Sequence, residues 1–142
     1  MANRIVVDSC FWFAVFSPRD SYHSVALSFL KEYFDKPAYE ILVPFPTMYE
    51  VLCTKFVKDK EALLGIKKVF NSNRVIKVYD ENYRDKAIEL TLSSVKRDLS
   101  LVDNIIRLML EDKQISAKGL ITFNIKDFVD VCQMNSIIIL NM

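Results

Sequence analysis

The chain has 142 residues, of which 51% are hydrophobic and 26% charged, and its formal net charge is +1. This composition fits one domain, residues 1–142, with a full apolar core, and the balanced charge gives no bulk sign of nucleic-acid binding. With only two glycines the sequence has no glycine-rich phosphate-binding loop, which excludes the common nucleotide-cofactor enzymes.

Short aliphatic runs predict buried strands at residues 5–7, 41–43, 75–78, 120–123 and 137–140. Apolar residues at helical spacing predict helices at about 10–16, 22–34, 48–57, 60–70, 81–95, 101–113 and 127–132. Ser9 and Asp59 are the expected caps of the first and fourth helices. Thr47–Glu50 and Ser100–Asp103 have the spacing of capping boxes. Because strands alternate with helices, we predict an α/β fold with helices on both faces of a mostly parallel sheet, whose 75–78 strand lies near an edge.

Five polar side chains fall where such a sheet gathers functional groups. Asp8 ends the first strand, Glu50 and Asp103 lie in the first turns of two helices, and Asn124 and Asp127 follow the fourth strand. The carboxyl ends of parallel strands and the amino ends of the following helices share one edge of the sheet. We therefore expect these segments, which are distant in sequence, to meet in one crevice.

Carboxylates brought close together repel each other, and burial adds several kcal/mol of cost to each of them. A divalent cation such as Mg²⁺ or Mn²⁺ removes that cost, takes oxygen ligands and leaves positions open for a substrate phosphate. The clustered acids therefore predict metal-assisted hydrolysis of a phosphodiester.

The acids also have ordinary structural explanations. Glu50 and Asp103 are equally explained as capping-box acids that satisfy backbone amides and the helix dipole, and Asp127 as a helix cap. Asp8 is harder to explain in this way, because a carboxylate after three aliphatic residues is costly without a function.

Structural roles are expected for several residues of types that often serve catalysis or base stacking. The only histidine, His23, lies on a predicted helix and is interpreted as structural. The aromatic residues of the first helix are interpreted as core and interface, and Met48 and Tyr49 as packing residues, rather than as platforms for bases. The three cysteines are widely spaced, without a disulfide framework or a zinc motif, and are interpreted as small buried hydrophobes in a reducing compartment.

Four segments of the chain resemble, in order and spacing, the four motifs of PIN-domain proteins: IVVDSCFW, PTMYEVL, SLVDNIIRLML and LITFNIKDF. In size the chain is most similar to the VapC-type toxins of that family. The resemblance implies a three-layer α/β/α, Rossmann-like domain with about five parallel strands, and a ribonuclease that depends on Mg²⁺ or Mn²⁺.

The resemblance also assigns residues. The acidic metal ligands of the family fall on Asp8, Glu50 and Asp103, and Ser9 and Thr122 match small hydroxyl positions that hold a carboxylate or the scissile phosphate. Asn124 stands where many members have aspartate, so either Asn124 or Asp127 is the fourth site residue. Candidate phosphate contacts, chosen because they lie near the motifs, are Lys55, Lys58, Arg74, Arg97, Arg107 and Lys126.

Further expectations follow from the resemblance and from the rest of the sequence. VapC-type toxins are commonly homodimers, and a small antitoxin covers their active site. No signal-peptide pattern opens the sequence and no apolar run approaches the ~18 residues of a membrane-spanning helix, so a cytoplasmic protein is expected. The leading hypothesis is an endoribonuclease. The alternatives are a DNA nuclease or phosphodiesterase of the same fold, and a non-catalytic binding module that has lost the metal.

Overall fold

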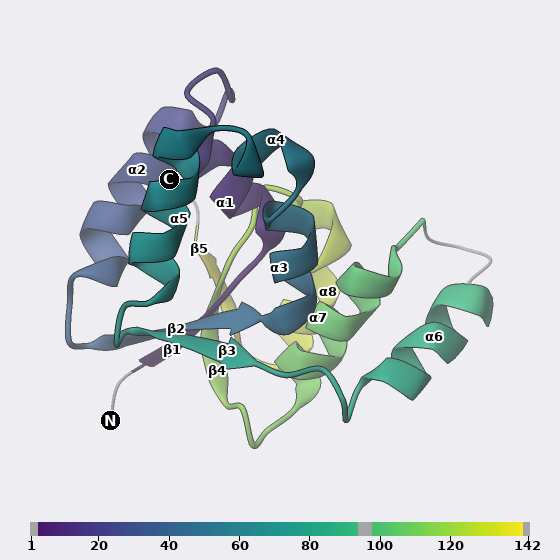
Figure 1. Cartoon of the computed structure of the whole chain (residues 1–142). Coiled ribbons are helices and arrows are strands. Elements are labelled where there is room, and N and C mark those ends of the chain that lie inside the picture. The colour runs from purple at the N-terminus through teal and green to yellow at the C-terminus, as the bar shows by residue number, and fades with distance from the viewer. Residues whose placement is uncertain (1–2, 94–97, 141–142) are drawn as a thin grey trace.

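The computed structural model describes residues 3–93 and 98–140, and within these residues the strands form one sheet (Figure 1). All strand pairs are parallel, and the strand order is β3-β2-β1-β4-β5. The strands are β1 (Asn3–Val7), β2 (Tyr39–Pro44), β3 (Val75–Val78), β4 (Ala117–Ile121) and β5 (Ile138–Leu140). The predicted α/β class is confirmed, and so is the place of β3 at an edge.

Helices connect the strands in every crossover. The α-helices are α1 (Ser9–Phe16), α2 (His23–Phe29), α3 (Phe45–Val51), α4 (Thr54–Val57), α5 (Lys60–Phe70), α6 (Arg84–Ser93), α7 (Leu101–Glu111) and α8 (Val129–Met134). A π-helical turn, η1 (Leu30–Phe34), continues α2, and a 3₁₀ turn, η2 (Ile125–Asp127), precedes α8. Within the described residues, no helix is long and apolar enough to cross a membrane.

The sheet is buried on both faces, which explains why its central strands are continuous aliphatic runs rather than alternating ones. On one face Ile5 and Val7 of β1 pack with residues of α1, α2 and α5. On the other face Val6 packs with residues of α7 and α8. α6 packs on α7 rather than on the sheet, through a small cluster that includes Ala87 and Met109 (Figure 1). The result is the three-layer α/β/α arrangement that was predicted.

The strand order reverses between β1 and β4, and this is where open α/β sheets bind ligands. The backbone N–H of Asp8 continues the ladder by donating to Ile121 O at 3.0 Å. The residues that follow β1 and β4 therefore leave the sheet side by side, at its carboxyl edge.

Two predicted caps are wrong. α3 begins at Phe45, because Pro44 and Pro46 fit the start of a helix. Thr47 therefore lies inside the helix, where its hydroxyl donates to Pro44 O at 2.7 Å, and Thr47–Glu50 is not a capping box. Asp8, not Ser9, caps α1, since its carboxylate accepts from the N–H of Ser9 at 2.7 Å. The Ser100–Asp103 capping box and the Asp59 cap are confirmed.

Some predicted boundaries also differ. The helix expected at 48–57 is divided into α3 and α4 around Leu52. The helix expected at 81–95 begins at Arg84, because Asp80 O first accepts from the N–H groups of Tyr83 and Arg84 in a turn; its expected end lies outside the described residues. β4 begins at Ala117, so that Gly119 is within the strand opposite Ile5 rather than before it.

Candidate active site at the carboxyl edge of the sheet

Asp8 is buried at this edge, with only 3% of its surface exposed. Its Oδ1 accepts from the backbone N–H of Ser9 at 2.7 Å, and its Oδ2 accepts from the Thr122 hydroxyl at 2.9 Å. Burial raises the pKa of the Asp8 carboxyl above its ordinary value of 3.8, and the Thr122 and Ser9 hydrogen bonds oppose this rise. Asp8 is thus held in one orientation by groups from β4 and from its own helix.

Cys10 belongs to the same hydrogen-bonded group, although the sequence indicated only a buried hydrophobe. Its thiol donates to Asp8 Oδ2 at 3.5 Å, lies 3.7 Å from Thr122 Oγ1 and accepts from the N–H of Phe123 at 3.3 Å. Burial, followed by the charge of Asp8, raises the pKa of this thiol to about 12. Cys10 is therefore a neutral thiol that supports the Asp8 carboxylate. Its place two residues after Asp8, in the first turn of α1, was the signal that could have indicated this role.

Glu50 on α3 and Asp103 on α7 complete a set of three acids that interact electrostatically. Burial raises the pKa of the Glu50 carboxyl above 4.5; the Ser9 side chain opposes this, and the charges of Asp8 and Asp103 add to it. Asp103 also adds to the raised pKa of Asp8. Asp103 is fixed by its capping box, in which Oδ2 accepts from the N–H of Ser100 at 3.1 Å. The structure thus brings three acids from three elements close enough to repel one another.

One oxygen of this set has no hydrogen-bond partner among the residues that the structure describes. Glu50 Oε1 is buried and accepts no hydrogen bond. A buried, unpaired carboxylate oxygen beside two further acids is costly unless a cation binds there. The donor set is entirely oxygen, which suits Mg²⁺ or Mn²⁺ rather than a thiolate-binding metal. Within residues 3–93 and 98–140, no group of three His, Cys, Asp or Glu side chains could hold a metal ion by itself. The residues fit a hard cation that also takes ligands from water or substrate.

The structure links Asn124 to this set more directly than Asp127. The backbone N–H of Asn124 donates to Thr122 Oγ1 at 3.0 Å, and that hydroxyl donates in turn to Asp8. The Asn124 side chain is exposed. Asp127 closes the η2 turn through its N–H and lines a separate open pocket with Asp98 and Lys126. Thr122 therefore connects Asn124 to Asp8 through two hydrogen bonds.

The sequence matches no protein-family model and no curated protein. Among solved structures, the chain is similar to VapC20 of Mycobacterium tuberculosis, a toxin that cleaves the sarcin-ricin loop. The TM-score is 0.69 at 18% identity, over 89% of this chain and 94% of that one. This likeness shows that the chain has the fold of that toxin, in agreement with the resemblance to PIN-domain proteins.

The cations near the predicted PIN motifs are mostly engaged or distant. Arg107 makes two hydrogen bonds of 2.8 Å to the Asp130 carboxylate and one of 2.8 Å to Asp127 O, so it is a structural residue. Arg74 precedes β3 and thus lies at the amino edge of the sheet, away from the acids. Lys55 donates to the Ser17 hydroxyl at 3.0 Å, with its Nζ 5.5 Å from the centre of the Phe56 ring.

Two cations predicted to contact phosphate are exposed, and one is not described. Lys58 ends α4, and Lys126 lies in η2, beside Asn124. Arg97 falls outside the described residues. An unpredicted cation, Arg84, lines a pocket between α3, α6 and α7 that Glu50 also lines, and it pairs with the buried Asp80 at 2.9 Å.

Some aromatic residues of the chain lie in the core and others lie on the surface. Phe11 and Trp12 are fully buried, as predicted, and His23 is structural, since its Nδ1 lies 2.7 Å from Ala14 O. Tyr49 was interpreted as a packing residue, and this is wrong: it is 75% exposed at the carboxyl edge. Local sequence did not indicate this, because Tyr49 lies among apolar neighbours and only the direction of α3 turns it outward.

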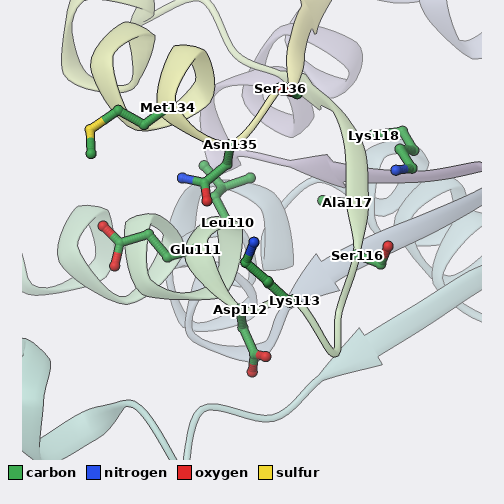
Figure 2. A pocket seen from close by; sticks show the side chains of 10 residues that line it. All are labelled: Leu110, Glu111, Asp112, Lys113, Ser116, Ala117, Lys118, Met134, Asn135 and Ser136. Carbon is green, nitrogen blue, oxygen red and sulfur yellow. The ribbon is translucent and has the colours of Figure 1, made fainter.

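A different pocket opens at the opposite edge of the sheet (Figure 2). It has a volume of about 300 Å³ and lies where β4 and β5 begin, between Lys113, Ser116, Lys118 and Asn135. Ser116 has a φ of 56°, in the left-handed region. This pocket is separated from the acids by the length of the strands and takes no part in the candidate site.

Proposed function

We propose that this chain is a metal-dependent endoribonuclease and the toxin of a toxin–antitoxin pair. The observation that carries the proposal is the meeting of Asp8, Glu50 and Asp103 at the strand-order reversal of a PIN fold, with Glu50 Oε1 buried and unpaired. Similarity to a toxin that cleaves the sarcin-ricin loop supports RNA, and in particular an accessible RNA loop, as the substrate.

In this proposal the three acids hold Mg²⁺ or Mn²⁺, and Asn124 or Asp127 completes the site. A divalent ion of this kind supplies an activated water and stabilises the charge that develops on the phosphate. Thr122 and Cys10 keep Asp8 Oδ2 in place, and the capping box keeps Asp103 in place. Ser9 lies against Glu50 and is available to hold that carboxylate or a phosphate oxygen. The raised pKa values of Asp8 and Glu50 mean that binding of a cation is coupled to loss of protons.

The partners are also proposals. An antitoxin that inserts a basic side chain would neutralise the three acids and occlude the site. A homodimer and a cytoplasmic location agree with the family resemblance.

The test is a cleavage assay on total RNA in Mg²⁺, in Mn²⁺ and in EDTA, with the parent and Asp103→Asn in parallel. Asn retains an oxygen acceptor for the capping box, so the variant is expected to fold while losing the carboxylate. Discrete, metal-dependent cuts that disappear in the variant are expected. Equal cleavage by the variant would contradict the proposed site.

Two further experiments test the alternative functions. A preference for labelled DNA over RNA would support the DNA-nuclease alternative. Absence of Mn²⁺ binding in calorimetry would support a non-catalytic module.

A further inference from the structure

A mostly apolar pocket of about 290 Å³ lies directly beside the acids, between α3, α6 and α7. Glu50 lines this pocket and also belongs to the acid set, so the two are continuous. The remaining wall is largely aliphatic and includes Ile88, Leu101 and Val102. Ile88 and Leu101 are each about two-fifths exposed, so apolar surface at the mouth remains in contact with solvent.

An aromatic rim leads to the mouth of the pocket. Tyr49 lines it and is 75% exposed. The ring of Phe45 meets Tyr49 edge to face at 5.5 Å and stacks on Tyr79 at 5.2 Å, and Tyr79 is 60% exposed. Phe45 and Tyr49 belong to α3, and Tyr79 directly follows β3, so the rim lies at the same carboxyl edge of the sheet as the acids. Exposed aromatic faces of this kind are the surfaces on which unpaired bases stack.

Polar groups in the pocket are matched to a flat heterocycle rather than to an aliphatic side chain. The Arg84 guanidinium is held on the Asp80 carboxylate by hydrogen bonds of 2.9 and 3.3 Å, and its side chain stays 55% exposed. Carboxylate oxygens accept from amino and imino groups, and the guanidinium donates to carbonyl and ring nitrogen atoms. A base satisfies these groups at its edge while its face contacts Tyr49 and the aliphatic wall. An aliphatic side chain would offer no partner to Glu50 Oε1 or to the exposed part of the Arg84 guanidinium.

We propose that this pocket binds a nucleobase of single-stranded RNA next to the scissile phosphate, with Tyr49 as the stacking residue and Arg84 as a base- or phosphate-positioning residue. The inference rests on the proposed function, since it names a subsite of the same nuclease. In this inference the pocket selects the position of the cut. Cleavage at the acids then requires an unpaired base that fits between α3, α6 and α7.

The test uses uncharged nucleosides, which need neither a metal nor catalysis. Adenosine, guanosine, cytidine and uridine are titrated into the ¹⁵N-labelled protein in EDTA, and ribose alone is the control ligand. We expect at least one nucleoside to shift the amide signals of Tyr49, Glu50 and Val102, while ribose does not. Tyr49→Ala should weaken that binding about fivefold or more, and Tyr49→Phe should retain it because the ring face remains. Leu64→Ala, an exposed apolar truncation on α5, should bind like the parent.

The outcomes separate this inference from the proposed function. No shift with any nucleoside, or the same shifts with ribose, would overturn the pocket assignment even if the protein cleaves RNA, and would favour a protein side chain as its occupant. Nucleoside binding by a protein that cuts no RNA would contradict the nuclease and support the pocket. On a cleaved RNA, Tyr49→Ala should raise KM while kcat stays close to that of the parent.

Discussion

The Thr122 hydroxyl donates a 2.9 Å hydrogen bond to Asp8 Oδ2 across 114 residues of sequence. This bond links the ends of β1 and β4 at the point where the strand order reverses, and both residues are buried. Because the bond favours the ionised form of Asp8, it opposes the effect of burial on that carboxyl. The hydroxyl therefore helps to keep Asp8 both oriented and charged.

Thr122→Val should make the Asp8 carboxyl both less well oriented and harder to ionise. Loss of the donor leaves a buried carboxylate oxygen with a poorer set of partners, which typically costs about 1–3 kcal/mol of stability. The pKa of Asp8 should rise further, so the acid limb of the pH–rate profile should move to higher pH. Urea denaturation and the pH dependence of RNA cleavage measure the two effects. Thr54→Val, at an exposed position on α4, is the matched control. An unchanged profile in Thr122→Val would show that the hydroxyl does not tune Asp8.

Without metal, the stability of the protein should increase as the pH falls through the raised pKa values of Asp8 and Glu50 toward their ordinary values. The folded-state pKa values of Asp8 and Glu50 lie above their ordinary values of 3.8 and 4.5, so in this window the folded state binds more protons than the unfolded state. Protonation then relieves the repulsion among the acids. Glu50→Gln should raise Tm in EDTA at pH 7 and flatten its pH dependence, whereas Glu32→Gln, at an exposed position, should do neither. A parent protein that loses stability on mild acidification, to the same extent as Glu50→Gln, would contradict this account.

Divalent cations should stabilise the parent. Binding only to the folded state adds about 2.7 kcal/mol at one hundred times Kd, and affinity should increase with pH because the acids must lose protons. Thermal scans with Mn²⁺, compared with EDTA, measure this effect. Glu50→Gln should lose most of the shift, and equal shifts in parent and variant would indicate a different binding site.

Arg107→Gln should destabilise the protein without a direct effect on RNA binding. The guanidinium is only 17% exposed and makes three hydrogen bonds of 2.8 Å, two to Asp130 and one to Asp127 O. Hydrogen bonds to charged groups are worth about 1.5–3 kcal/mol, so a loss within or somewhat above this range is expected in urea denaturation. Lys126→Gln, at an exposed position, should be neutral for stability. Weaker RNA binding by fully folded Arg107→Gln would reinstate Arg107 as a phosphate contact.

Cys10 should resist alkylation in the folded protein. Its pKa of about 12 leaves very little thiolate at pH 8, and the thiol is engaged with Asp8 and with the N–H of Phe123. Mass spectrometry after brief iodoacetamide treatment should find Cys10 unmodified in native protein and modified in urea. Cys10→Ser should remain active, because serine keeps both a donor and an acceptor, while Cys10→Val should lose activity. Rapid alkylation of Cys10 in the native protein would contradict the engagement of its thiol with Asp8 and Phe123.

The sequence was sufficient where local patterns decide the structure. Aliphatic runs such as Ile5–Val7 identified the strands, and the Ser100–Asp103 spacing identified a real capping box. The predicted Thr47–Glu50 capping box was wrong, because two prolines start α3 earlier than its apolar pattern indicates. The exposure of Tyr49, the pairing of Arg107 with Asp130 and the contact between Cys10 and Asp8 depend on how helices are oriented over the sheet. No local pattern contains that information.

The pairing of β1 with β4 also has a consequence for synthesis of the protein. A ribosome releases β1 early, but its neighbour β4, with Thr122 beyond it, emerges only after most of the chain. Contacts this far apart in sequence form late, because the intervening loop must be closed before they contribute. A nascent chain that ends before β4 has the three acids and β2 beside β1, but it lacks the strand on the other side of β1 and the Thr122 hydroxyl that orients Asp8. The hydrogen bond that orients Asp8 therefore forms only after β4 has been made, and a polypeptide that ends before β4 lacks it.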